Sequence, residues 1–380
     1  MKPSKSFGIP VKHAVLSFLP RMMAALPSIT LILSLALAGC KDGSSAAMPV
    51  DKPAVTATPA VYTSPTPPRA AAVFTTISAH RRDSTVTEQT PSAIKYKAGE
   101  NPEFARKSGW PVTSPPPLPG SLLPHRRIVA YYGNPLSRRM GILGEVPKDD
   151  MLLMLKEEVN RWEVADPATP VQPALHLIAV VAQGKPGKAG LYRMIVTDEI
   201  ANRVYGWAKE AHALLFIDIQ TGHEDIRTLL PRFEWLLKNP DVHLGIDPEF
   251  NLIKSGKKPG TIIGTYDAAD VNYVSGYLRD VVQKYRLPPK ILIVHRFTQH
   301  GVTNAREITL RPEVQIVINM DGWGAPWLKR DSYKYYVVAE PVQYTGFKLF
   351  YHNDTKRRDS LMTPKDILKL RPQPIYIQYQ

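Results

Sequence analysis

Two carboxylates at positions 247 and 249 have the clearest potential for chemistry in this sequence. Asp247-Pro248-Glu249 closes an apolar run, which places it at the carboxyl end of an expected strand. Side chains alternate along a strand, so Asp247 and Glu249 would share one face, with Cβ atoms roughly 6–7 Å apart. Crowding raises the pKa of one carboxyl, which then becomes an acid beside an ionised partner. The alternative is an aspartate that only ends the strand before Pro248.

Further polar and aromatic side chains stand at the ends of other apolar runs. Asp218 could orient a catalytic group, and His295 could carry a proton or bind a metal, although either could also be structural. The tryptophans that follow Asp321 could stack on sugar rings. The full set of supporting candidates is Asp218, Gln220, His295, Asp321, Trp323, Trp327, Lys348 and Tyr131.

A metal centre is the alternative for the same residues. Asp218, Asp247, Glu249 and His295 include the ligand types that a divalent ion prefers. The sequence lacks an H-x-H after the first apolar run and an H-E-x-x-H motif. We therefore predict an acid–base site with no metal and no cofactor.

Eight short apolar runs must position these groups. They cover residues 127–132, 175–181, 213–218, 242–247, 290–295, 314–319, 346–351 and 374–379. Most are continuous hydrophobic strings, which is typical of parallel strands covered on both faces. Residues 125–380 also approach the length of about 250 residues expected for one (β/α)8 barrel.

Helical patterns separate several of these runs. Apolar residues recur at three- and four-residue spacings in residues 149–162, 198–213, 223–237 and 267–284, and Thr197 is a suitable N-cap. Residues 132–136 after the first run lack the G-x-G-x-x-G spacing of a dinucleotide site. The fold class predicted is α/β, a single (β/α)8 TIM-type barrel.

The acidic motif carries a resemblance. Asp-x-Glu at the end of the fourth strand resembles the signature of chitinase-like and muramidase-like barrel glycosidases, and Asp321 matches the aspartate after their sixth strand. The chain departs from the chitinase-like pattern at His243 and Gly245, where further aspartates would stand. The whole domain, through residues 131–134, 247–249 and 346–351, resembles an uncharacterised group of bacterial TIM-barrel lipoproteins.

The amino-terminal part predicts export and lipid anchoring. Lysines and an arginine precede a charge-free stretch over residues 22–38, the layout of a signal sequence. Leu37-Ala38-Gly39-Cys40 resembles a bacterial lipobox, and Cys40 is the single cysteine of the 380 residues. We predict a signal peptide over 1–39 and attachment to membrane lipid through acylated Cys40. The domain would face the periplasm or the cell exterior.

The composition of residues 40–120 predicts a disordered tether that ends where the barrel domain, 121–380, begins. This segment is rich in Pro, Ala, Ser and Thr, as at residues 63–68 and 114–119. Basic residues are scattered along the chain, although the net charge is +14. We therefore expect no nucleic acid partner, and cell-wall polysaccharide is the candidate partner.

The leading hypothesis is a glycoside hydrolase of cell-envelope amino-sugar polymers, with Glu249 as general acid. Asp247 would orient Glu249 or stabilise positive charge, supported by Asp218 and Asp321. The alternative is a barrel without activity that binds wall polysaccharide or another protein. Neutralisation of Asp247 by Arg296 or Lys348 would favour this binding function.

Overall fold

The computed structural model describes residues 95–380. The predicted signal peptide, Cys40 and residues 40–94 of the predicted tether lie outside these residues. Within residues 95–380, no helix is long and apolar enough to cross a membrane.

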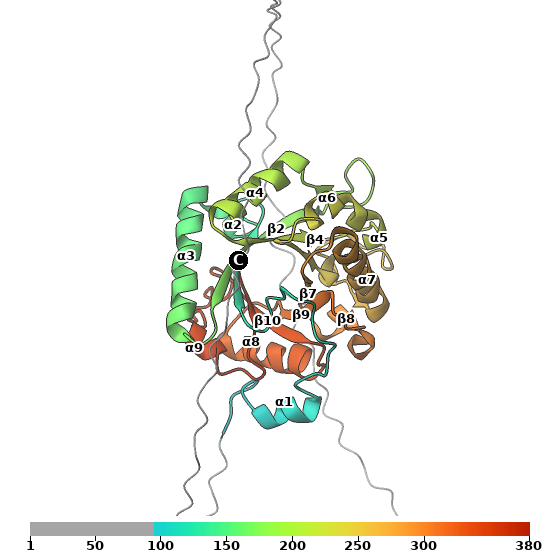
Figure 1. Cartoon of the computed structure of the whole chain (residues 1–380). Coiled ribbons are helices and arrows are strands. Elements are labelled where there is room, and N and C mark those ends of the chain that lie inside the picture. Colours follow the sequence, from blue (N-terminus) through green and yellow to red (C-terminus); the bar gives the residue numbers. More distant parts are fainter. Residues whose placement is uncertain (1–94) are drawn as a thin grey trace, which may run out of the picture. The chain divides into compact units, whose positions relative to one another are not determined.

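Eight parallel strands form a closed barrel, as predicted. Neighbouring strands follow the order β1-β11-β10-β9-β7-β5-β4-β2, and β1 pairs with β2 to close the ring. Figure 1 shows the helices arranged around these strands. The strands are β1 (Arg127–Gly133), β2 (Val171–Ala182), β4 (Leu214–Ile219), β5 (Val242–Ile246), β7 (Lys290–Arg296), β9 (Val314–Met320), β10 (Tyr344–Leu349) and β11 (Tyr376–Tyr379).

Three shorter strands lie outside the ring. β3 (Arg193–Ile195) pairs antiparallel with the end of β2, so the chain after β2 folds back on it. β6 (Tyr266–Asp267) and β8 (Val302–Thr303) form a separate parallel pair.

The helices occupy the predicted segments with one break. Thr197 caps helix α4 (Asp198–Glu210), accepting a hydrogen bond from the Ile200 amide at 3.4 Å. The predicted helix over 223–237 is divided by a 3-10 turn at Pro231, because proline lacks the N–H that a continuous helix needs. The helices are α2 (Ile142–Glu145), α3 (Lys148–Ala165), α4 (Asp198–Glu210), α5 (Ile226–Leu229), α6 (Glu234–Leu237), α7 (Ala268–Tyr285), α8 (Pro326–Ser332) and α9 (Pro364–Ile367).

Side-chain alternation divides the core into two layers. In β4, Leu215 and Ile217 belong to the outer cluster packed between strands and helices. Phe216 belongs to a smaller cluster inside the barrel, together with Ile128 and Val317. Because every strand alternates, polar residues on the inner face at the strand ends must meet at one mouth of the barrel.

The prediction of a disordered tether is wrong for residues 95–120. Residues Pro102–Ser108 form helix α1, and the buried Trp110 donates from its indole nitrogen to the Val338 carbonyl at 2.9 Å. Arg330 pairs with Glu100 at 3.2 Å. A proline-rich chain needs no backbone ladder to dock when aromatic side chains such as Trp110 anchor it. The folded domain therefore begins near residue 95.

Candidate active site

A pocket of about 410 Å3 opens at the carboxyl ends of the strands. This is the end at which TIM-barrel enzymes place their reacting groups. The lining combines carboxyl, amide and cationic groups with several aromatic rings. The lining residues are Tyr132, Arg139, Met140, Ile178, Val181, Ala182, Gln220, Asp247, Glu249, Phe250, Phe297, Asp321, Trp323, Lys348, Phe350, Asn353 and Gln380.

Three of these residues form an acid cluster, Asp247, Glu249 and Asp321. One carboxylate oxygen from each lies within 4.8 Å of the others. Asp247 immediately follows β5 and Asp321 immediately follows β9. Glu249 lies in the 3-10 turn Pro248–Phe250 and not on the strand, so the turn brings it beside Asp247. Asp247 and Glu249 are thus close together, as predicted, but Glu249 is positioned by the turn and not by the strand.

Lys348 of β10 gives the acid cluster its cation. Its Nζ lies 2.8 Å from Asp321 Oδ1 and 3.9 Å from the centre of the Tyr132 ring. Burial alone would raise the pKa of Asp321, but Lys348 and His295 outweigh it and hold the pKa below its usual range. Asp321 is therefore the ionised member of the cluster.

The other two carboxyls favour the protonated form. Burial, followed by the negative charges of Asp218 and Asp321, raises the pKa of Asp247 well above its ordinary value. Burial, followed by Asp247 and Asp321, does the same to the pKa of Glu249. The site thus holds both proton-bearing carboxyls and an ionised carboxylate, the combination that acid–base catalysis needs.

Neither Arg296 nor Lys348 pairs with Asp247, and such pairing was the observation that would have favoured a binding function without catalysis. Lys348 pairs with Asp321, and Arg296 of β7 pairs with Glu340. Asp247 instead accepts a long hydrogen bond of 3.4 Å from the Gln220 amide.

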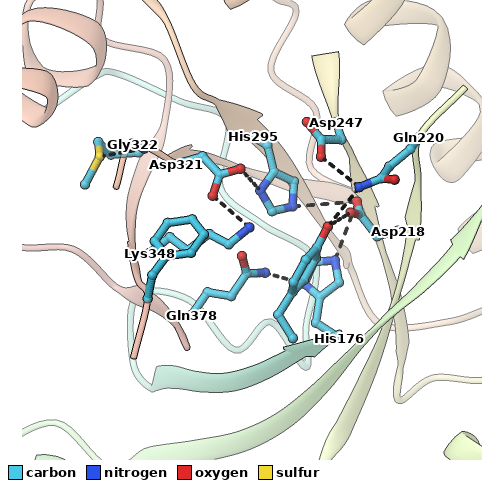
Figure 2. Close-up of polar contacts among 12 residues, drawn as sticks. His176, Asp218, Gln220, Asp247, His295, Asp321, Gly322, Lys348 and Gln378 are labelled. Atoms are coloured by element: carbon cyan, nitrogen blue, oxygen red, sulfur yellow. Dashed lines mark hydrogen bonds and ion pairs between the residues drawn. The ribbon is translucent and has the colours of Figure 1, made fainter. Parts of the chain in front are cut away.

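Below the pocket lies a buried group formed by His176, Asp218 and His295. Figure 2 shows both imidazole rings directed at Asp218, and His295 placed between Asp218 and Asp321. Asp218 also accepts a hydrogen bond of 2.8 Å from the Tyr132 hydroxyl. Burial lowers the pKa of His176 to about 4.

The predicted site residues fall into three places. Gln220, Asp321, Trp323 and Lys348 line the pocket with Asp247 and Glu249, whereas Asp218 and His295 lie beneath it. Tyr131 points to the outer layer, where its hydroxyl is 3.0 Å from that of Tyr351. Trp327 on α8 is 66% exposed and is not among the residues that line the pocket.

Several site residues were missed by the sequence analysis. His176 stands in the middle of β2, and its place as the single polar residue of the apolar run 175–181 is a signal that could have found it. Tyr132, which the sequence analysis did not single out, lies on the inner face of β1, where its hydroxyl donates to Asp218. The other pocket residues missed include Phe250, Phe297, Phe350, Asn353 and Gln380.

A buried ion pair positions the loop that carries Trp323 at the pocket. Lys329 of α8 lies 3.0 Å from Asp354, and the side chains are 1% and 2% exposed. Asp354 also accepts a hydrogen bond from the Gly324 amide at 2.8 Å. These contacts fix the loop that carries Trp323, whose ring remains 48% exposed beside the acid cluster.

The fold and the site together define the domain as a (β/α)8 barrel with an acidic pocket at the strand carboxyl ends. No family model and no curated protein matches the chain.

Among solved structures, the chain is similar to barrel enzymes at low identity. One is a GH5-4 broad specificity endoglucanase from an uncultured bacterium, with 11% identity, TM-score 0.31, and coverage of 58% of this chain and 76% of that chain. Another is Thermotoga maritima Cel5A, crystallised with cellobiose as a mutant form, with 12% identity, TM-score 0.37, and coverage of 67% and 88%. At these identities and TM-scores, no activity is inferred from the likeness.

Proposed function

We propose that the barrel domain is a glycoside hydrolase acting on amino-sugar polymers of the cell envelope, with Glu249 as general acid. The observation that carries this proposal is the acid cluster in the wall of the pocket, with carboxylate oxygens within 4.8 Å of one another. Glu249 would protonate the leaving glycosidic oxygen. Asp321, ionised beside Lys348, would attack the anomeric carbon as the leaving oxygen departs. Water deprotonated by Glu249 would then hydrolyse the bond between the sugar and Asp321, and Asp247 would orient Glu249.

The spacing of the cluster favours retention of configuration at the anomeric carbon. Retaining glycosidases hold their two carboxyls about 5–5.5 Å apart, whereas inverting enzymes need about 6.5–9.5 Å to admit a water molecule. Oxygens of Asp321 and Glu249 within 4.8 Å fit the shorter distance.

The amino-sugar substrate is supported by the resemblance of Asp247-Pro248-Glu249 to chitinase-like and muramidase-like barrels. The aromatic side chains at the pocket, Trp323 above all, offer faces on which sugar rings stack.

A direct assay of hydrolysis tests this function. The purified protein is incubated with peptidoglycan and with chitin oligomers, and reducing ends and product anomers are followed by chemical assay and NMR. Turnover with a retained anomer supports the proposal. Binding to the polymer without turnover would contradict it and favour a wall-binding barrel.

The raised pKa of Glu249 predicts a shifted alkaline limb of activity. A general acid works only when protonated, so kcat/KM should fall about tenfold per pH unit above that pKa. Because burial and neighbouring carboxylates raise the pKa of Glu249, the midpoint should lie well above 4.5, the ordinary value for a glutamate. A pH–rate profile measures it, and a limb centred near the ordinary value would refute the assignment.

We also propose that acylated Cys40 anchors the domain to a membrane. Replacing Cys40 with serine is expected to move the protein from the membrane fraction to the soluble fraction of cells, because the acyl chains attach through the sulfur. Unchanged membrane association in this variant, measured by fractionation and immunoblot, would argue for a different anchor.

A further inference from the structure

We propose that His176, Asp218 and His295 bind a divalent transition metal ion of the zinc type beneath the pocket. This inference goes beyond the proposed hydrolase activity and does not depend on it. It rests on the convergence of three donor atoms, on their lack of other partners, and on the groups that orient them.

The donor atoms have the spacing of a metal coordination shell. Nε2 of His176 and Nε2 of His295 each lie 3.6 Å from the same atom, Asp218 Oδ1. The three residues each place a ligand atom within 4.8 Å of the others. Ligands about 2.0–2.2 Å from a tetrahedral zinc ion stand roughly 3.3–3.6 Å from one another.

These three atoms have no hydrogen-bond partner in the described part of the chain. His176 and Asp218 are 0% exposed and His295 is 1% exposed, so water does not reach them from outside. A buried polar atom without a partner costs about 1–3 kcal/mol, so native proteins rarely leave several together. One ion would satisfy all three atoms.

Direct hydrogen bonds from the two histidines to Asp218 explain these distances less well than a shared ion does. N–H···O hydrogen bonds are about 2.7–3.2 Å long, and both nitrogen–oxygen distances here are 3.6 Å. The rings are therefore close enough to share an ion with Asp218 but too far away to donate well to it.

Two of the three ligands are also oriented by a second group. His176 Nδ1 lies 2.6 Å from the Tyr376 hydroxyl and 3.0 Å from the Gln378 amide nitrogen. Asp218 Oδ2 accepts from Tyr132 at 2.8 Å, whereas His295 Nδ1 lies 3.3 Å from Asp321 Oδ2 without forming a hydrogen bond. An ion bound at Nε2 of His176 requires Nδ1 to carry the proton and donate it to the Tyr376 hydroxyl, as metal-binding histidines commonly donate their other ring N–H to an oxygen.

Gly245 of β5 keeps the space between the donors open. A Cβ atom at this position would lie 2.5 Å from both Asp218 Oδ1 and His176 Nε2. A point at that distance from two donor atoms is close to where a bound ion would sit. Any larger residue at 245 would fill it.

The donor set selects the class of ion. Two imidazoles and one carboxylate suit zinc and its transition-metal neighbours, whereas magnesium and calcium prefer oxygen ligands. The ion would hold His295 against Asp321, and so connect the buried group to the acid cluster above it.

The test measures metal content and stability, so it needs no substrate. The full-length protein is purified without metal-affinity chromatography from zinc-supplemented cells and analysed by mass spectrometry of metals. The same protein is then stripped with a chelator, and its Tm is recorded with zinc and with magnesium. The variants are His176→Gln and Gly245→Ala, with His243→Gln as control. His243 is a matched control because its ring, like that of His176, is buried 5.2 Å from the Phe216 ring, but it lies outside the cluster.

We expect about one transition metal ion per chain in the parent and in His243→Gln, and less than about a tenth of that in the two other variants. Zinc, and not magnesium, should raise the Tm of the stripped parent, because an ion that binds the native state stabilises it.

A parent that carries no metal and shows no zinc-dependent Tm would overturn the inference. An equal zinc response in His176→Gln would do the same. If His176→Gln does not fold, the stripped parent alone decides. If the parent binds metal and the two variants lose it, while no form of the protein hydrolyses the polymers, this inference stands and only the proposed function is contradicted.

Discussion

Replacing Glu249 with glutamine is expected to lower kcat for hydrolysis by at least about a hundredfold while the barrel stays folded. Glutamine keeps the size of the side chain, but its amide protons are not acidic enough to be transferred to the leaving oxygen. Glu249 is partly buried in the pocket wall, so the substitution leaves the surrounding packing in place. Initial rates of reducing-end release from peptidoglycan or chitin oligomers, at saturating substrate, measure the effect.

The same substitution should not reduce stability at neutral pH. Because the pKa of Glu249 is raised in the folded state, the folded protein binds more protons than the unfolded chain at pH values between the ordinary and the raised pKa. Stability contributed by this group therefore falls as pH rises from about 4.5 through the raised pKa. Glutamine removes that penalty, so thermal unfolding at pH 7 should occur at or above the parent Tm.

Glu157→Gln is the matched control. Its side chain on α3 is 56% exposed, pairs with Arg161, and is not among the residues that line the pocket. We expect parental activity for this variant. If Glu249→Gln keeps more than about a tenth of the parental kcat, or if both variants lose activity equally, Glu249 is not the general acid.

Much of the architecture could be predicted because parallel strands have a simple signature. Runs such as residues 290–295 are apolar throughout, since helices cover one face and the barrel interior the other. All eight runs match strands of the barrel, and Asp247 and Asp321 lie at its mouth as their strand-end positions predicted.

The same signature hides which face a residue occupies. Tyr131 and Tyr132 are adjacent in β1, and both faces of this strand are buried, so composition cannot assign them. The structure places Tyr132 inside, against Asp218, and Tyr131 outside, against Tyr351. His176 was missed for a related reason, because strand tilt brings the middle of β2 to the level of the ends of β4 and β7.

Composition also failed to predict that residues 95–120 are folded, because single aromatic side chains dock this proline-rich segment. Residues 95–120 have the makeup of a linker, yet Trp110 is 8% exposed and its indole hydrogen-bonds to the barrel domain. The bias toward Pro and Ser describes how the chain behaves alone, whereas docking depends on individual side chains that meet a complementary surface.

Replacing Lys348 with methionine is expected to lower the free energy of unfolding by about 3–5 kcal/mol. Lys348 and Asp321 are each 3% exposed and lie 2.8 Å apart. Methionine fills a similar space, but it leaves the buried Asp321 carboxylate without its main positive partner. Equilibrium urea denaturation at pH 7 measures the change. Unlike Glu249→Gln, this variant should lose stability and hydrolysis together, because the ionised carboxylate of the acid cluster depends on this cation.

Two further variants separate charge from packing. Lys369→Met removes a lysine that is 61% exposed and lies 3.9 Å from Asp366, so it should stay within about 0.5 kcal/mol of the parent. In the double variant Lys348→Met/Asp321→Asn no buried charge is left without its partner, and most of the lost stability should return. If the double variant is as unstable as Lys348→Met, the loss comes from the contacts of the Lys348 ammonium with the Tyr132 and Phe350 rings, and the ion pair with Asp321 is not what stabilises the mouth of the barrel.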